Sequence, residues 1–167
     1  MKQYDFQKQK GVGDAGESIL DTYFISLGYR VEEVNMAEQR KGIDRIIVTP
    51  DGKELKVEYK TDSLTASTGN LFIETISSTK SGALGWALKT QANFVVYYVP
   101  DWSKALIIDP KILREMIPIW IFQYHQKPVK NAGYFSFGIP VPWNIMKQFF
   151  KEIEIKVEGV LDEENQD

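Results

Sequence analysis

Hydrophobic residues at helical spacing mark the first clear element of the chain. They are Ile19, Leu20, Tyr23, Phe24 and Leu27. Gly28 follows them as a helix-ending residue, so the pattern predicts a helix over residues 13–27. The polar, lysine-bearing residues 1–12 are expected to form a loose arm or a first helical turn.

Short apolar or alternating runs predict the strands. They are expected over residues 29–34, 43–49, 55–60, 71–76, 94–99, 105–108 and 134–139. Further helices are expected over residues 82–91 and 142–153. Another should begin at Asp109-Pro110, where Asp is a preferred N-cap and Pro a preferred first helical residue. With no repeat and no long linker, the chain is predicted to form a single α/β domain over residues 1–167.

The composition changes this picture in two ways. The chain has no cysteine, no secretory signal and no apolar run of about 20 residues, so a cytoplasmic protein without a membrane span or disulfides is expected. A net charge of −3 counts against a nucleic-acid partner. However, the acidic tail 158–167 carries five acids and no base, and without it basic residues outnumber acidic ones by 20 to 18. The charge therefore weakens this interpretation without excluding it.

Alternation along the strand 55–60 separates its polar from its apolar side chains. Glu58 and Lys60 are predicted to share one face, roughly 6.6 Å apart along the strand, while Leu55, Val57 and Tyr59 lie on the other. Taken alone, this pattern is more typical of a solvated strand face.

The turn at Pro50-Asp51-Gly52 relates this strand to the one before it. Asp44 and Glu58 each lie seven residues from Asp51, so an odd-numbered loop centred there places them opposite one another, with Cβ atoms about 4.5–5.5 Å apart. Two carboxylates at that distance destabilise the fold unless a cation such as Mg²⁺ binds between them. A two-residue turn would instead shift the register by one and place Asp44 on the wrong face.

Two further acids have two interpretations each. Glu17 lies on the apolar stripe of the first helix and could face a metal-bound water, but Asp14 to Glu17 also has the spacing of a capping box. Glu74 shares a strand face with Phe72 and Ile76. It is either a buried partner for an arginine or part of a site.

These residues carry a resemblance to the PD-(D/E)XK nuclease superfamily, which includes the restriction-endonuclease-like and Holliday-junction-resolvase-like enzymes. The similar segments are Gly13–Glu17, Gly42–Asp44 and Glu58–Lys60, and the stretch from Glu58 to Glu74 resembles phage-type endonuclease-like proteins. Ile43 stands where the motif's name has proline. The resemblance implies an αβββαβ core over residues 13–99 with a mixed central sheet flanked by helices. Residues 100–157 would be a C-terminal extension.

The resemblance also implies a site and a reaction. Asp44, Glu58 and the backbone carbonyl of Tyr59 would bind Mg²⁺, for which Mn²⁺ should substitute, and Glu17 would reach the metal through water. Lys60 would position the attacking water or stabilise charge on the phosphate. The expected function is therefore endonucleolytic hydrolysis of DNA, with a junction-like substrate and a homodimer as expectations by resemblance. A catalytically silent DNA- or protein-binding relative, or a hydrolase of another substrate, are the alternatives.

Basic residues scattered along the sequence could contact the phosphate backbone of DNA. They are Lys8, Lys10, Arg40, Lys41, Lys80 and Lys89.

Overall fold

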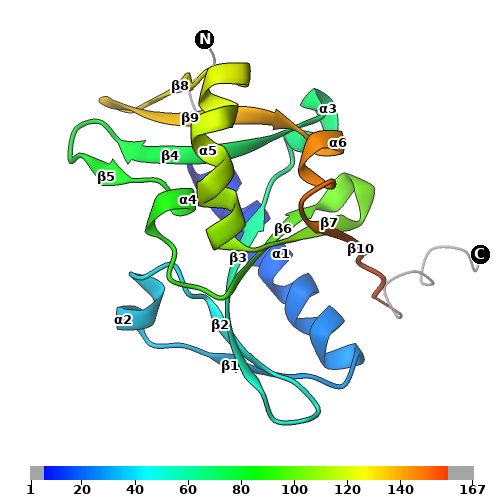
Figure 1. Cartoon of the computed structure of the whole chain (residues 1–167). Helices are drawn as coiled ribbons and strands as arrows, with labels where there is room; N and C mark the ends of the chain where they lie inside the picture. Colours follow the sequence, from blue (N-terminus) through cyan, green and yellow to red (C-terminus); the bar gives the residue numbers. More distant parts are fainter. Residues whose placement is uncertain (1–5, 158–167) are drawn as a thin grey trace, which may run out of the picture.

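The computed structural model describes residues 6–157, with side chains from residue 10 onward, and its strands form two sheets (Figure 1). The larger sheet contains, in spatial order, β1 (Arg30–Glu33), β2 (Arg45–Val48), β3 (Glu54–Thr61), β6 (Phe94–Val99), β7 (Lys104–Ile108) and β10 (Lys151–Glu154). The smaller sheet contains β5 (Ala83–Leu84), β4 (Asn70–Ser78), β9 (Tyr134–Pro142) and β8 (Lys127–Asn131). In the larger sheet β3 and β6 are parallel and the other neighbours antiparallel, so the predicted mixed α/β class is confirmed.

Six α-helices and one 3-10 helix accompany these strands in the described part of the chain. They are α1 (Phe6–Ser26), α2 (Met36–Gln39), α3 (Thr65–Thr68), α4 (Trp86–Lys89), η1 (Pro100–Trp102), α5 (Pro110–Tyr124) and α6 (Trp143–Met146). The order α1, β1, β2, β3, α4, β6 is the expected αβββαβ succession, with β4 and β5 inserted before α4. No helix within residues 6–157 has the length and apolar character needed to cross a membrane.

Several element boundaries differ from those predicted. The first helix begins at Phe6, so part of the expected loose arm is helical. The predicted helix over 82–91 is only the single turn of α4, because residues 83–84 pair with β4. The predicted helix over 142–153 is wrong beyond Met146, since Lys151–Glu154 pairs with the free edge of β7 instead. The start of α5 is confirmed, with Asp109 accepting a hydrogen bond from the Lys111 amide at 2.8 Å.

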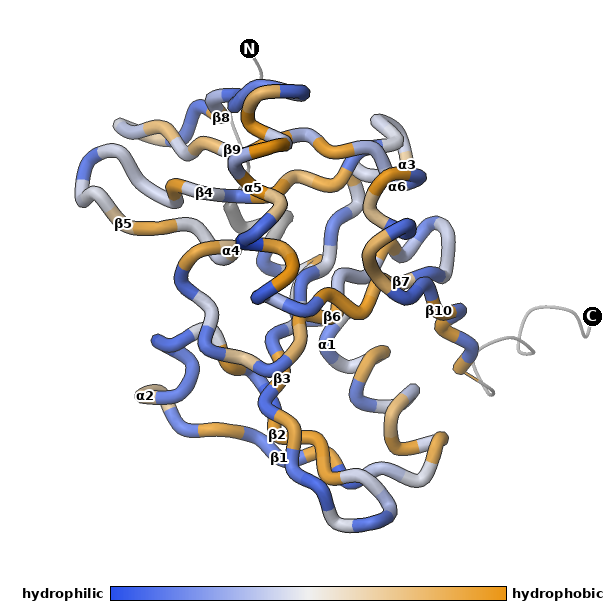
Figure 2. Tube along the Cα trace, viewed as in Figure 1, coloured by the Kyte–Doolittle hydropathy of each residue, from blue (hydrophilic) through white to orange (hydrophobic). Residues whose placement is uncertain are grey.

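The two faces of the six-stranded sheet carry separate cores. One core joins the sheet to α1 and contains Leu20, Phe24, Val57, Tyr59 and Val96. The other core lies between the opposite face, the four-stranded sheet, α5 and α6; its members include Val95, Leu106, Leu71, Ile139, Trp120 and Trp143. The strand β6 supplies both cores, which explains its largely hydrophobic trace in Figure 2.

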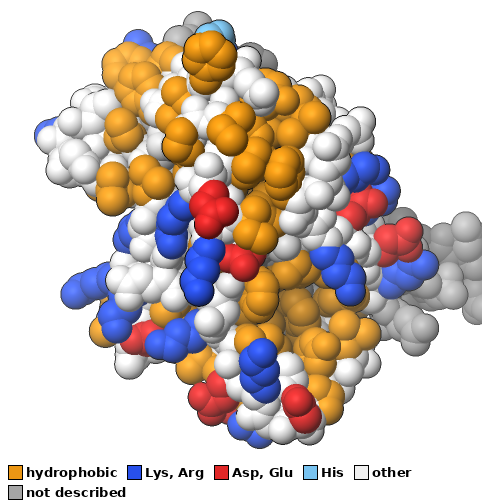
Figure 3. Space-filling model, viewed as in Figure 1, with side chains coloured by type: hydrophobic (Ala, Val, Ile, Leu, Met, Phe, Trp, Pro, Cys, Tyr) orange, Lys and Arg blue, Asp and Glu red, His pale blue; other side chains and the backbone are white. Residues whose placement is uncertain are grey.

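Charged and apolar surfaces are separated on one face of the molecule. Figure 3 shows apolar side chains gathered over α5, where Ile119 and Phe122 are exposed, while charged side chains predominate below them, around α4. α4 is fixed there by its end residue, because the Thr90 hydroxyl donates to the Gly42 carbonyl at 2.9 Å. This contact joins α4 to the segment that leads into β2.

Candidate active site

A pocket of about 210 Å³ opens on the face of β3 that points away from α1. The larger sheet contributes Asp44, Glu58 and Lys60, and the smaller sheet contributes Glu74. α4 provides Lys89, which is exposed at the rim. Three carboxylates and two ammonium groups from distant parts of the sequence therefore line one pocket.

The β2–β3 hairpin has the predicted odd-numbered loop and brings Asp44 and Glu58 into one pocket, although Asp44 lies just outside the paired ladder. The register pairs Val48 with Glu54 and Arg45 with Val57, so the loop is odd-numbered and is centred on Asp51. Asp44 directly precedes β2 and donates its amide to the Val57 carbonyl at 2.8 Å. The alternative two-residue turn is thereby excluded, and both carboxylates lie on the pocket side.

Glu58 is a buried carboxylate with one oxygen unused. The residue is only 4% exposed, so a solvated strand face does not describe it. Its Oε1 lies 2.8 Å from Lys60 Nζ, while Oε2 is buried and has no hydrogen-bond partner among the described residues. Burial raises the pKa of Glu58 and Asp44 adds to this effect, against the opposing effects of Lys60 and of the nearby Thr90 hydroxyl. An unpaired buried carboxylate oxygen is costly and is suited to a cation.

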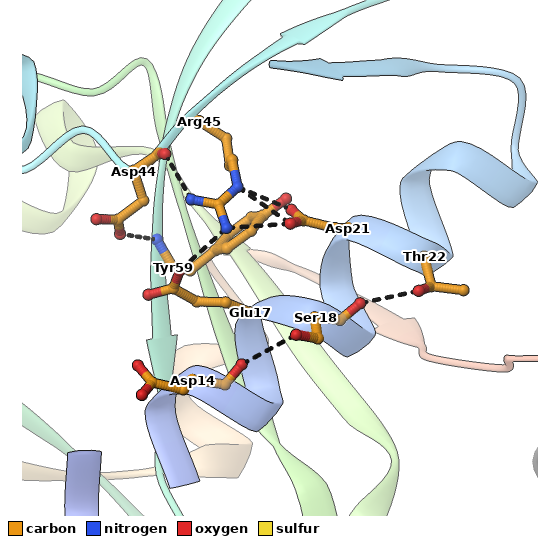
Figure 4. A network of polar contacts seen from close by, with 8 residues as sticks. All are labelled: Asp14, Glu17, Ser18, Asp21, Thr22, Asp44, Arg45 and Tyr59. Atoms are coloured by element: carbon orange, nitrogen blue, oxygen red, sulfur yellow. Dashed lines mark hydrogen bonds and ion pairs between the residues drawn. The ribbon is translucent and has the colours of Figure 1, made fainter. Parts of the chain in front are cut away.

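The two carboxylate oxygens of Asp44 likewise differ, since one is hydrogen-bonded and the other is not. Its Oδ2 accepts a hydrogen bond from the Tyr59 amide at 2.8 Å, and its Oδ1 has no bond drawn to it in Figure 4. The Tyr59 amide and carbonyl point to the same edge of β3 as Asp44, because the neighbouring even-numbered residues bond to β6 instead. Oδ1, the Tyr59 carbonyl and Glu58 Oε2 are thus available oxygen ligands around one end of β3.

Lys60 stands among carboxylates in this pocket. Burial opposes its charge, but Glu58, and then Asp44 and Glu74, overcome this effect and raise the pKa of Lys60 above its ordinary value. Its side chain is still 34% exposed. The side chain is therefore an ammonium ion that a bound molecule can reach.

Glu74 enters the pocket from the four-stranded sheet, in line with the second of its two interpretations from sequence. Burial raises its pKa, while Lys60 and the backbone amide of Trp86 lower it. Within residues 6–157 it forms no ion pair with an arginine, so the proposed arginine partner is not found. Glu74 belongs to the pocket instead.

Glu17 lies on the opposite side of the hairpin, in a network around Arg45 (Figure 4). The Arg45 guanidinium contacts Glu17 Oε2 at 3.1 Å and Asp21 Oδ2 at 3.0 Å, and donates to the Asp44 carbonyl at 2.9 Å. Because α1 begins at Phe6, Asp14 is inside the helix and the capping-box interpretation of Glu17 is wrong. Burial, and then the nearby Asp44 carboxylate, raise the pKa of Glu17. Glu17 therefore lies toward Asp44 but is paired with an arginine that the sequence reasoning missed.

The predicted phosphate-contacting residues have different surroundings. Lys10, Arg40 and Lys80 are exposed, and Lys41 pairs with Glu38 at 2.8 Å. The side chain of Lys8 lies outside the described residues. Of this group, Lys89 alone lines the pocket as it is described over residues 10–157.

The donor set fits a hard divalent cation held by few protein ligands. Among the described side chains, no three His, Cys, Asp or Glu residues are arranged to share one ion. Two carboxylates and a main-chain carbonyl are nevertheless sufficient for Mg²⁺, which keeps several of its waters and is commonly bound by one or two protein carboxylates. The unpaired Oε2 of Glu58 is the feature that favours such an ion.

The fold is similar to that of a bacterial homing endonuclease, I-Ssp6803I. The two structures superpose with a TM-score of 0.50 over 64% of this chain and 72% of the other, at 18% sequence identity. No family model matches the sequence, and no curated protein matches it significantly. The similarity establishes a nuclease-like α/β fold, which agrees with the element order described above.

Proposed function

We propose that the protein is a Mg²⁺-dependent endonuclease that hydrolyses DNA phosphodiester bonds. This proposal rests on how the two carboxylates of the pair use their oxygens. Asp44 and Glu58 each use one oxygen in the fold and leave the other free, beside the charged Lys60. A merely structural pair would have no reason to leave a buried oxygen of Glu58 unpaired.

The residues of the pocket suit the separate tasks of phosphodiester hydrolysis. Asp44, Glu58 and the Tyr59 carbonyl would hold the metal ion, which when bound supplies a polarised phosphate and a more acidic water. Lys60 cannot ligate while it is charged, but its ammonium can donate to a phosphate oxygen that gains charge during attack. Lys89, on the rim, is placed to contact a neighbouring phosphate of the same strand.

The fold likeness supports a nucleic-acid substrate, since the similar structure is that of an endonuclease. By the resemblance of Gly42–Asp44 and Glu58–Lys60, we further propose cleavage that leaves a 5′-phosphate and a preference for branched DNA.

The decisive experiment is a cleavage panel. The purified protein is incubated with four-way junction, flap and linear duplex DNA and with RNA of the same sequence, in Mg²⁺, Mn²⁺ or EDTA. We expect cleavage of DNA in either metal, none in EDTA, and none by Asp44→Asn under any condition. Binding of DNA without cleavage in every buffer would favour the catalytically silent alternative, and cleavage in EDTA would refute the metal site.

A further inference from the structure

The position of Lys60 bears on how many metal ions the pocket can hold, a question that deepens the proposed function and rests on it. The three carboxylates come from two sheets: Asp44 and Glu58 from the β2–β3 hairpin and Glu74 from β4. Lys60 lies on the same strand face as Glu58 and lines the same pocket as Glu74. The question is therefore which of the carboxylates a cation can use.

The two carboxylate oxygens of Glu58 have different neighbours in the pocket. Its Oε2 lies on the Gly42 side, close enough that a Cβ added to Gly42 would be 3.0 Å from it. Its Oε1 lies on the other side, 2.8 Å from the Lys60 ammonium. The free oxygen therefore faces the segment that carries Asp44, while the occupied one is committed to Lys60.

Glu74 lines the same pocket from β4. The β4 backbone at Glu74 packs so closely against Gly85 that a Cβ on residue 85 would collide with the Glu74 carbonyl. The Gly85 amide also donates a hydrogen bond to the Thr75 carbonyl at 2.9 Å. Glu74 also couples electrostatically to Lys60, since the charge of each favours the ionised form of the other. The ammonium thus shares one pocket with carboxylates of two sheets and forms its ion pair with Glu58.

We propose that the pocket binds a single divalent cation, at Asp44 and Glu58, because the Lys60 ammonium, paired with Glu58 Oε1 in the pocket that Glu74 also lines, occupies the place of a second one. Glu74 is then a positioning residue for Lys60. The formal charges agree with this occupancy: three carboxylates and one ammonium leave −2 in the interior of the pocket, which one dication neutralises. Lys89 is exposed at the rim, where solvent screens its charge.

The test counts Mn²⁺ ions by calorimetric titration and by electron paramagnetic resonance of the unbound ion, with circular dichroism as a check on folding. We expect one ion in the wild type and one in Glu74→Gln. Lys60→Met should bind two, because it frees Glu58 Oε1 and Glu74 for a second cation. The double variant Lys60→Met/Glu74→Gln should return to one ion. Glu54→Gln, an exposed acid on the same strand but outside the pocket, should match the wild type.

A kinetic measurement separates positioning from mere structure. Glu74→Gln should lower kcat by roughly 10–100-fold, as is typical for loss of an outer-shell partner, and leave KM for DNA unchanged. Two ions in the wild type, one ion in folded Lys60→Met, or loss of Mn²⁺ binding in Glu74→Gln would each overturn this inference. A wild type that binds no Mn²⁺ would instead refute the proposed function itself.

Discussion

The two sides of the β2–β3 hairpin hold carboxylates in opposite ways. On the α1 side, Arg45 contacts both Glu17 and Asp21 through its guanidinium. On the pocket side, Lys60 contacts one oxygen of Glu58 and leaves the other without a partner. The same hairpin thus carries carboxylates paired with an arginine on one face and a carboxylate with a buried unpaired oxygen on the other.

The difference follows from the two cations. A guanidinium has five donors in a fixed planar fork, so one arginine can satisfy several carboxylate oxygens at once. An ammonium is a compact point charge on a flexible stem and leaves neighbouring oxygens free for another cation. The α1 side should therefore contribute to stability and the pocket side to metal binding and catalysis, and variants on each side test this division.

The largest effect is expected from Asp44→Asn. Asparagine keeps an acceptor for the Tyr59 amide but removes the negative charge, so Mn²⁺ affinity and cleavage should be lost together. The loss of activity should exceed the roughly 10²–10³-fold typical of one charge-stabilising group. Asp21→Asn is the matched control from the other side and should retain both properties. An equal loss in Asp21→Asn would remove the distinction between the two clusters.

Lys60→Ala should have the next largest effect, and it should separate binding from chemistry. The ion at Asp44 and Glu58 should still bind, because a charged lysine is not a ligand. The nicking rate should fall by about 10²–10³-fold, since a preorganised positive charge is lost. Mn²⁺ affinity and single-turnover rates on one DNA substrate measure the two quantities. Cleavage at the wild-type rate would mean that Lys60 has no part in the reaction.

Arg45→Leu should instead change stability. Breaking a fully buried ion pair costs about 3–5 kcal/mol, but Glu17 and Asp21 retain 36% and 25% side-chain exposure. A loss of about 1–3 kcal/mol is therefore expected from urea unfolding, with Mn²⁺ stoichiometry unchanged. Lys104→Ala, which removes an exposed pair with Glu152 at 3.6 Å, should lose less than Arg45→Leu. If Arg45→Leu abolished metal binding without loss of stability, Arg45 would belong to the site.

Local sequence signals were sufficient for the pocket's central pair. The turn at Asp51 sets an odd loop, and Gly52, with φ of +87°, adopts the backbone that this turn requires. Because side chains alternate along a strand, that one turn places Asp44, Glu58 and Lys60 on the same side. The sequence therefore predicts the hairpin half of the site provided that the loop is odd-numbered; a two-residue turn, which the sequence left open, would have placed Asp44 on the other face.

The rest depended on packing between distant elements, which periodicity does not encode. Glu74 reaches the pocket only because the four-stranded sheet lies against it, and Arg45 finds its partners only because α1 crosses β3 closely. Gly16 has a low intrinsic helix propensity, yet it is inside α1, where a side chain would collide with Thr61. A residue that locally weakens a helix is thus explained by a contact 45 positions away.

The smallest expected effect is the pH dependence contributed by Glu58, measured without metal. Burial raises the pKa of folded Glu58 above the ordinary value of 4.5, so the folded state binds this proton more tightly than the unfolded state. The stability of the wild type relative to Glu58→Gln should therefore be greatest below pH 4.5 and fall as the pH rises through the folded pKa. Urea unfolding of both proteins in EDTA, between about pH 4 and pH 8, measures the difference.

Glu38→Gln supplies the opposite trend as a control. Hydrogen bonds from Lys41 and Lys56 lower the pKa of Glu38, so its contribution should be present above pH 4.5 and fade as the pH falls. Saturating Mn²⁺ should remove the loss at neutral pH in the wild type, because the metal favours the ionised carboxylate, and should have no such effect in Glu58→Gln. A stability difference between wild type and Glu58→Gln that stays constant with pH would mean that folding leaves the pKa of Glu58 unchanged, and the argument from burial for a cation at this carboxylate would then fail.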